Sequence, residues 1–242
     1  MKIKLLVAAA ATVVASSAMA QSAFEGFYGQ VGTGYESNTV TNLSSPYTVT
    51  TSSGTYTGTS SAGNQTASGM PLVLGIGYTF AVTGPWLVGL GADYSALSQK
   101  TGAYTATQAQ NGGGSSTSTG NQLELSNRYN IFVTPSYAVD KDKLVYLKAG
   151  YSSGQAKATS PAQSTDPSIS NTINTSGYIV GLGYKQIITG GLYGFAEGNY
   201  MSYASTSSNV SWRSTNNAYN VSVNQTGASN AYTLLVGVGY KF

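Results

Sequence analysis

Leu235-Val236-Gly237-Val238-Gly239-Tyr240-Lys241-Phe242 closes the chain, and this stretch decides the fold. From Val236 onward an apolar side chain falls on every second residue, whereas glycine or lysine occupies the positions between. Successive side chains of a β-strand point to opposite faces, so this strand has one apolar face and one small or polar face. Such alternation predicts a strand that lies against an apolar medium on one side.

Seven earlier segments repeat this pattern. They are Gly26 to Tyr35, Met70 to Phe80, Trp86 to Leu97, Gln122 to Tyr137, Leu144 to Tyr151, Tyr178 to Lys185 and Leu192 to Tyr203. In the fourth segment we expect Leu123 and Leu125 to face outward, and Glu124 and Arg128 to face inward. Segments of about ten alternating residues suit strands that cross a bilayer, where every backbone polar group must be bonded in a closed barrel.

The connections between these segments alternate in length. Three are short, around Val82 to Pro85, Asp140 to Lys143 and Thr189 to Gly191. The other four are long, from Asn38 to Ser68 and from near Ser98, Ser152 and Ala204 onward. The sequence therefore predicts an all-β, antiparallel, up-and-down transmembrane β-barrel of eight strands, with three short periplasmic turns and four long extracellular loops. The Ser, Thr, Asn and Gly content of the four long connections indicates mobile, hydrated loops.

The N-terminus reads as a secretory signal peptide. Lys2 and Lys4 form the basic region, Leu5 to Ala15 the apolar region, and Ala18-Met19-Ala20 the cleavage site before Gln21. The apolar region is too short to cross a bilayer as a helix. We therefore expect residues 1–20 to be removed, with Ala18, Ala20 and Gln21 at the cleavage site, and residues 21–242 to form one barrel domain in the outer membrane of a Gram-negative cell.

Composition excludes several kinds of chemistry. Charged residues make up 8% of the chain, and without Lys2 and Lys4 nine basic residues face eight acidic ones, so no nucleic-acid partner is indicated. The chain has no Cys and no His, which removes disulfides, thiolate or imidazole metal sites and Ser-His catalysis. A Ser-Lys dyad stays formally open, but no motif surrounds any Ser. We expect no enzyme activity and no cofactor.

The chain resembles the small outer-membrane barrels that include the OmpA transmembrane domain, OmpX and the opacity-type adhesins. The resemblance is carried by the signal peptide, the alternating strands, Tyr193-Gly194-Phe195-Ala196-Glu197-Gly198-Asn199-Tyr200 and the closing Gly237 to Phe242. It implies that Val238, Tyr240 and Phe242 form the signal read by the barrel-assembly machinery. Unlike full-length OmpA, the protein is expected to carry no peptidoglycan-binding domain after the barrel.

The inward-facing charges are balanced in sign. The acidic ones are Glu36, Asp93, Glu124 and Glu197, and the basic ones are Arg128, Lys148, Lys185 and Lys241. We expect Arg128 near Asp93, and Glu197 near Lys148 or Lys185. Side chains fill the interior of an eight-stranded barrel, so these pairs should plug it. The open alternative is a gate in which rearranged pairs admit water and ions.

Aromatic residues fall into three groups. A periplasmic girdle is expected from Tyr78, Phe80, Trp86, Tyr137, Tyr184, Tyr240 and Phe242, and an outer girdle from Tyr35, Tyr94, Tyr151, Tyr178, Tyr200 and Tyr232. The loops carry Tyr47, Tyr56, Tyr104, Trp212 and Tyr219. These five would contact a partner or pack within the loops.

The leading functional hypothesis is a structural and surface-interaction protein, with a role in adhesion or envelope integrity through its polar loops. Its partners would be outer-membrane lipid and lipopolysaccharide, the assembly machinery and a host or cell-surface ligand, and the protein would be a monomer. The alternative is a narrow porin-like channel for ions or small solutes, favoured if the glycine-rich inner face leaves a water path. A secreted soluble β-protein is a third reading, which leaves Phe242 unexplained.

Overall fold

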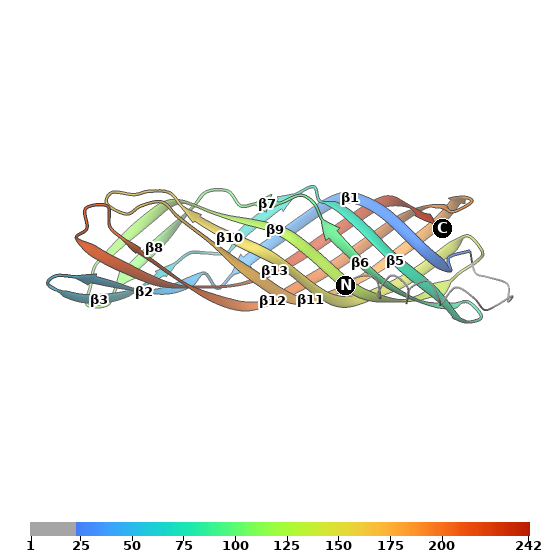
Figure 1. Cartoon of the computed structure of the whole chain (residues 1–242), viewed down its shortest axis with the longest axis horizontal. Helices are drawn as coiled ribbons and strands as arrows, with labels where there is room; N and C mark the ends of the chain where they lie inside the picture. Colours follow the sequence, from blue (N-terminus) through green and yellow to red (C-terminus); the bar gives the residue numbers. More distant parts are fainter. Residues whose placement is uncertain (1–22) are drawn as a thin grey trace, which may run out of the picture.

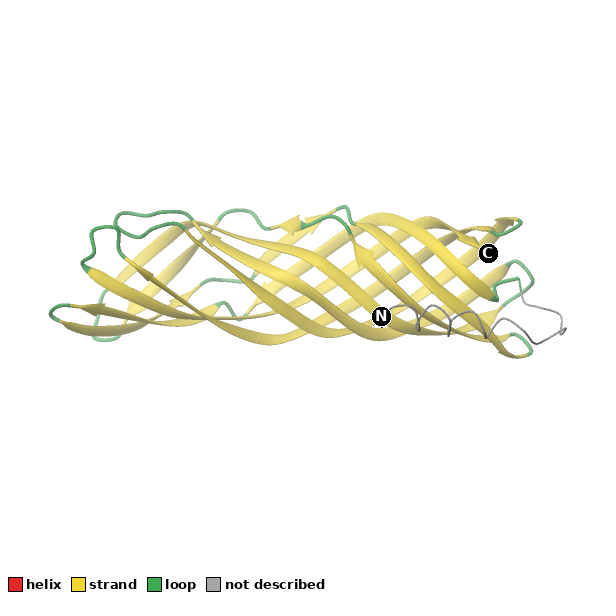
Figure 2. Cartoon of the chain, in the orientation of Figure 1, coloured by secondary structure: helices red, strands yellow, loops and turns green. Residues whose placement is uncertain are grey.

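The computed structural model describes residues 23–242, and they form an antiparallel sheet of thirteen strands. Figure 2 shows strands and connecting loops throughout this part of the chain. No helix within residues 23–242 is long and apolar enough to cross a membrane. The expected signal peptide and its cleavage residues Ala18, Ala20 and Gln21 lie outside the described residues.

Eight strands form a circuit of antiparallel pairs that returns to its start, which we call the base ring. They are β1 (Gly26–Thr41), β5 (Leu72–Thr83), β6 (Trp86–Ser95), β9 (Ser115–Ala138), β10 (Lys143–Ser160), β11 (Ile169–Thr189), β12 (Leu192–Arg213) and β13 (Tyr219–Lys241). Each pairs with the next along the chain, and β1 pairs with both β5 and β13. The strands cross the long axis obliquely (Figure 1), as closure of a barrel requires.

The three short connections lie together at one end, which we call the turn end. They join β5 to β6, β9 to β10 and β11 to β12, and the C-terminus lies at the same end (Figure 1). Gly84 and Gly190 have φ values of 53° and 55°, in the left-handed region that a side chain disfavours. The backbone conformation of these two turns therefore favours glycine at both positions.

An outward-facing apolar band surrounds the base ring. Ile76, Leu182 and Leu234 are 69%, 61% and 67% exposed, whereas in a protein surrounded by water such side chains are usually buried. Aromatic rings meet along both edges of this band. At the turn end Trp86 contacts Tyr137 and Tyr240 contacts Phe242, while at the other edge Tyr200 lies between Tyr178 and Tyr232. Apolar strands between two aromatic rims are typical of a β-barrel in a bilayer.

The expected long loops are corrected by the structure, because most of their residues form strands. β2 (Ser44–Thr51), β3 (Gly54–Ser61) and β8 (Tyr104–Gln110) pair in sequence between β13 and β9. Together with β9 to β13 they form a second circuit, the distal ring, at the end opposite the turns (Figure 1). The strand count is thirteen instead of eight. The Thr, Val and Tyr content of these segments favours strands over mobile loops.

Two short strands close the wall between the rings. β4 (Gln65–Gly69) pairs with β1, and β7 (Gln99–Lys100) pairs with β9. A single bridge between Ala67 and Thr101 joins the two. The sheet is thereby continuous around the barrel at the level where β5 and β6 end and β2, β3 and β8 begin.

A β-bulge in β9 overturns three expected orientations. Ser126 and Tyr129 lie opposite Gln155 and Ser153, so an extra β9 residue is accommodated here, and Asn127 has a φ of 50°. A bulge shifts the alternation by one residue. Leu123 is therefore buried and Leu125 faces the interior, whereas Glu124 lies on the outside. The prediction for these three residues was wrong because it assumed unbroken alternation through Asn127.

Candidate functional site

The interior of the base ring is crossed by a buried cluster of charges around Lys148. Its Nζ lies 2.7 Å from Asp93 Oδ2 and 2.9 Å from Glu197 Oε1, and the side chain is 1% exposed. Lys148 belongs to β10, Asp93 to β6 and Glu197 to β12. Because these strands are separated around the ring, the two ion pairs span the lumen.

Neutral groups complete the hydrogen bonding of the two carboxylates. Asn130 Nδ2 donates to Asp93 Oδ1 at 2.5 Å, and the Tyr146 hydroxyl donates to Glu197 Oε2 at 2.7 Å. Asn199 Nδ2 donates to Glu197 Oε1 at 2.8 Å. A buried charge is tolerated when it is paired and hydrogen-bonded, so each charge of this cluster, which we call the ionic plug, has the partners that burial requires.

A second charge pair lies nearer the distal ring. Arg128 on β9 binds Glu36 on β1 through two parallel hydrogen bonds, with 2.6 Å between Nη1 and Oε1 and a shorter contact between Nη2 and Oε2. Asn38 Nδ2 also donates to Glu36 Oε1, at 2.7 Å. The sequence places Arg128 near Asp93, but the ion pair of Arg128 is with Glu36 and not with Asp93. Asp93 is opposite Asn130 in the sheet and Arg128 is opposite Ser95, which puts the guanidinium one step farther from the turns.

Lys185 is held by aromatic rings. Its Nζ lies 3.9 Å from the ring centroid of Tyr28, 4.9 Å from that of Tyr193 and 5.4 Å from that of Tyr146. No ion pair joins it to a carboxylate within the described residues, so Glu197 pairs with Lys148 and not with Lys185. Cation–π contacts strengthen in desolvated surroundings, which accounts for a lone ammonium in this position.

The other two expected members of the network lie apart from it. Glu124 pairs with Lys100 at 3.4 Å, and their side chains are 29% and 54% exposed, so this pair lies outside the lumen. Lys241 lines a small cavity near the turn end together with Phe24 and Lys185. No ion pair of Lys241 occurs within residues 23–242. The plug therefore consists of Lys148 and Arg128 with their three carboxylates, and Lys185 beside them.

Glycines on the inner face make room for aromatic rings. A Cβ at Gly183 would overlap the ring of Tyr146, and one at Gly239 would overlap the ring of Tyr193. Tyr146 and Tyr193 are buried, with 4% and 2% of their surface exposed. Tyrosine rings thus occupy the space that glycine leaves at these two positions.

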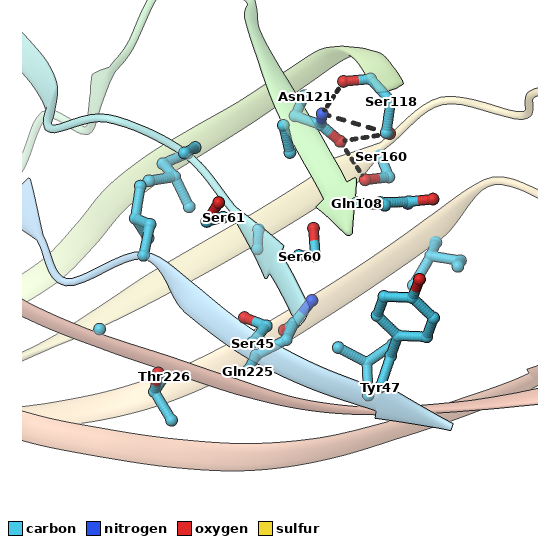
Figure 3. A pocket seen from close by; sticks show the side chains of 18 of the residues that line it. Ser45, Tyr47, Ser60, Ser61, Gln108, Ser118, Asn121, Ser160, Gln225 and Thr226 are labelled. Carbon is cyan, nitrogen blue, oxygen red and sulfur yellow. Dashed lines mark hydrogen bonds between the residues drawn. The ribbon is translucent and has the colours of Figure 1, made fainter. Parts of the chain in front are cut away.

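The distal ring encloses a cavity of about 530 Å³, which we call the vestibule (Figure 3). On one wall Leu125, Ala156 and Ile173 are register partners across β9, β10 and β11, and all three line the cavity. The wall formed by β13 and β2 carries the paired Val221 and Val49. These strands lie across the circuit from each other, so two aliphatic patches face one another.

Most polar groups on the β9 to β12 side of the vestibule bond to one another. Asn121 bonds with both Ser118 and Ser160, as the dashed lines of Figure 3 show. Trp212 Nε1 and the Tyr219 hydroxyl donate to Asp166 Oδ1 at 3.0 and 3.1 Å. Asp166 is the one charged side chain among the described residues that line the cavity.

Three tyrosines on the opposite side have hydroxyls free to bind other molecules. Tyr47, Tyr56 and Tyr104 come from β2, β3 and β8 and line the vestibule. Within residues 23–242 their hydroxyls have no hydrogen-bond partner. Burial raises the pKa of Tyr104, so its hydroxyl keeps its proton near neutral pH.

A small buried apolar cluster lies on the β11 to β13 side of the interior, at the turn-end side of the vestibule. Ile179, Met201, Tyr203 and Ala231 form a buried cluster from β11, β12 and β13. The Tyr203 hydroxyl is 2.8 Å from Ser152 Oγ on β10. Ala231 lies opposite Asn38 on β1, two residues from Glu36, so this cluster lies at the level of the Arg128–Glu36 pair.

Sequence reasoning missed the vestibule because it treated these segments as loops. The five aromatic residues assigned to the loops all line it, namely Tyr47, Tyr56, Tyr104, Trp212 and Tyr219. Two signals were present in the sequence. Val221 and Val223 are spaced as on one strand face, and so are Leu123 and Leu125.

Solved structures with a similar fold are outer-membrane proteins. The outer membrane protease OmpT from Escherichia coli superposes with a TM-score of 0.52 at 13% identity, covering 94% of this chain and 100% of that one. OprG from Pseudomonas aeruginosa has a TM-score of 0.44 at 14% identity, with 90% of this chain and 96% of that one covered. Ail, the attachment invasion locus protein of Yersinia pestis, has a TM-score of 0.36 at 14% identity, with coverages of 86% and 99%.

These likenesses extend to the fold and no further. No protein-family model and no curated protein matches the sequence. At 13% identity the OmpT likeness shows a shared architecture, and the two weaker superpositions carry no argument about activity. The chain has the fold of a small outer-membrane β-barrel protein, and its function must be argued from its own residues.

Proposed function

We propose that the protein is an outer-membrane barrel with a closed lumen, which presents the distal ring and its vestibule at the cell surface for interaction with a partner. The observation that carries this proposal is the position of Lys148, clamped between Asp93 and Glu197 across the base ring. In this proposal the eight strands of the base ring cross the membrane, the three turns face the periplasm and the distal ring lies outside the cell.

The outer surface supports this placement. Exposed apolar side chains are concentrated on the base ring, between the two aromatic rims, whereas the outer face of the distal ring is mostly Ser, Thr, Asn and Gln. An apolar outer band suits lipid, and a polar wall suits water and lipopolysaccharide. Val238, Tyr240 and Phe242 are 49%, 51% and 78% exposed, so they are accessible for the proposed role in barrel assembly.

The interior supports a binding role over passage. Two buried ionic groups, one of them beside an apolar cluster, lie between the vestibule and the turn end. A channel would need these groups to separate, which would leave buried charges without partners. The described residues contain no group of three or more metal-ligating side chains, and the sequence has no His. Surface interaction therefore agrees with more of the molecule than a pore does.

Planar-bilayer recordings test whether the lumen is closed. The full chain is reconstituted, and heat-dependent gel migration confirms that the barrel is folded. We expect no reproducible conductance steps from folded protein. Stable openings of the unaltered chain would overturn the closed lumen and establish the narrow channel instead.

Labelling of single cysteines tests the orientation, because the chain has no Cys of its own. Ser53, between β2 and β3, and Lys141, between β9 and β10, are exposed sites at opposite ends. Ser53→Cys should react with a membrane-impermeant maleimide on intact cells, and Lys141→Cys should react only after the outer membrane is opened. The reverse pattern would show that the distal ring faces the periplasm.

A further inference from the structure

We propose that the vestibule binds an uncharged molecule that has an aliphatic body and a hydroxyl-bearing head. This inference deepens the proposed function, on which it rests for the outward exposure of the distal ring. The cavity volume of about 530 Å³ falls within the range of about 300 to 1,000 Å³ that is usual for small-molecule sites. A site of this size encloses one small molecule.

The charge of the lining selects an uncharged molecule. No Lys or Arg is among the described residues that line the vestibule, so an anion has no counter-charge there. Asp166 is already engaged by Trp212 and Tyr219, which both donate to the same carboxylate oxygen. Asp166 is the single counter-charge that a cation would find among the described lining residues, and its Oδ1 already accepts these two hydrogen bonds. A charged ligand that displaces the water from the cavity would lose its hydration against the aliphatic walls without gaining a partner, which would be costly.

The shape of the lining selects the aliphatic body. Leu125, Ala156 and Ile173 form a continuous patch through register pairing, and Leu123 with Ala158 extends it by one pair. Val221 and Val223 face this patch from β13. A chain of methylene groups held between the two patches would remove apolar surface from water on both of its sides.

The unpartnered tyrosine hydroxyls of the vestibule favour a ligand whose head carries hydroxyl groups. Tyr47, Tyr56 and Tyr104 come from β2, β3 and β8, which are neighbours in the distal ring. A tyrosine hydroxyl both donates and accepts a hydrogen bond. A head with hydroxyl groups can use both, whereas the polar side chains of the opposite side are occupied with each other.

Tryptophan fluorescence provides a direct test, because the chain has two tryptophans at opposite ends of the barrel. Trp212 lines the vestibule, and Trp86 lies on the outer surface at the turn-end rim. Trp86→Phe leaves a reporter in the vestibule alone, and Trp212→Phe leaves one in the membrane rim alone. The probe is a medium-chain alcohol with a terminal bromine, a quencher of indole fluorescence, added to protein in lipid nanodiscs.

We expect saturable quenching in the Trp86→Phe chain and only linear, partition-driven quenching in the Trp212→Phe chain. The corresponding brominated carboxylate should bind at least tenfold more weakly, because no cation lines the cavity. Linear quenching in both chains would overturn the site. Equal binding of the alcohol and the carboxylate would overturn the assignment to uncharged molecules.

A matched pair of substitutions in the Trp86→Phe chain locates the binding. Ala156→Phe fills the vestibule, whereas Ala109→Phe adds the same group on the outer face of β8. The first should weaken binding at least tenfold, and the second should leave it unchanged. If Ala156→Phe fails to fold, Ala106→Phe fills the same cavity from β8. Unchanged binding in a folded, filled variant would overturn the location.

Failure of this inference is distinguishable from failure of the proposed function. Saturable binding by a barrel that also conducts would overturn the closed lumen and leave the site standing. A silent barrel that reacts at Ser53→Cys on intact cells but shows no saturable quenching would overturn the site alone.

Discussion

The base ring and the distal ring share five strands, β9 to β13, and yet they enclose opposite interiors. In the base ring the inner face holds ion pairs, hydrogen-bonded amides and packed tyrosines, while aliphatic side chains face outward. In the distal ring the aliphatic side chains of Leu125, Ile173 and Val221 face inward, while polar ones face outward. The same strands therefore change which face is apolar along their length.

The surrounding medium explains this inversion. Hydrocarbon outside the base ring favours apolar outward side chains, so the polar ones are gathered inside and must satisfy one another. Water outside the distal ring restores the ordinary preference for apolar residues within. On β9 the bulge at Asn127 shifts the alternation by one residue, so that leucine side chains turn from the outer to the inner face. On β12 a register shift between Tyr203 and Thr206 occurs at a similar level.

The largest expected effect comes from breaking the ionic plug. Lys148→Met would leave Asp93 and Glu197 as neighbouring buried carboxylates without their shared ion-pair partner. Removing one partner from a buried ion pair costs about 3–5 kcal/mol, so the free energy of unfolding should fall by about that amount. Urea titration followed by heat-dependent gel migration measures it.

Lys157→Met is the matched control for this substitution. Lys157 lies on the same strand, but its side chain is exposed and has no ion pair among the described residues. Its replacement should change stability by less than about 0.5 kcal/mol. Similar losses in both variants would show that the clamp around Lys148 contributes little, and the contrast between the rings would lose its main support.

A smaller effect is expected from filling the inner face of the base ring. Gly183→Ala would force a methyl group into the ring of Tyr146, which also hydrogen-bonds Glu197. Overpacking of this kind costs about 1–3 kcal/mol. Gly63→Ala serves as the control, because nothing lies within 4 Å of a Cβ at Gly63. Equal stability of the two variants by urea titration would indicate an inner face with room to spare.

The base ring could be predicted from the sequence far better than the distal ring could. Alternating side chains are typical of a strand between lipid and lumen. The sequence assigns Tyr193 and Glu197 to the inside, where the charge of Glu197 decides between the two possible registers of a less regular strand. Pairing partners could not be assigned in this way, because Arg128 meets Glu36 across 92 residues of sequence and strand register decides such distances. Leu123 faces inward because of the bulge at Asn127. The polar residues around Asn127 give no sign of a bulge in the sequence.

The distal ring should tolerate a charge that the base ring would reject. Ala158→Asp places a carboxylate on the vestibule wall, where water entering the cavity can solvate it. We expect the free energy of unfolding to change by less than about 1 kcal/mol. Ala109→Asp, on the outer face of β8, provides the reference value. A loss of several kcal/mol at Ala158 alone would mean that the vestibule wall is packed and dry, contrary to the proposed binding site.

The smallest effect concerns pH and the exposed turn between β9 and β10. The Lys143 side chain bonds Asp140 Oδ2 at 2.9 Å, and the Asp142 amide bonds Oδ1 at 2.8 Å. The hydrogen bond from Lys143 is the largest cause that lowers the pKa of Asp140 below its usual 3.8, and the same bond raises the pKa of Lys143 above its usual 10.5. These shifts mean that the pair stabilises the fold between those two pH values.

The sign of the effect follows from each shift. The lowered pKa of Asp140 gives stability above pH 3.8 that is lost as pH falls through the folded-state value, and the raised pKa of Lys143 gives stability that is lost above pH 10.5. Asp140→Asn should therefore be slightly less stable than the parent at pH 7 and equal to it near pH 2, whereas Asp142→Asn removes the same charge without this bond. A constant difference at both pH values would assign the loss at Asp140 to turn geometry. The contribution is small because both side chains are exposed, in contrast to the buried clamp at Lys148.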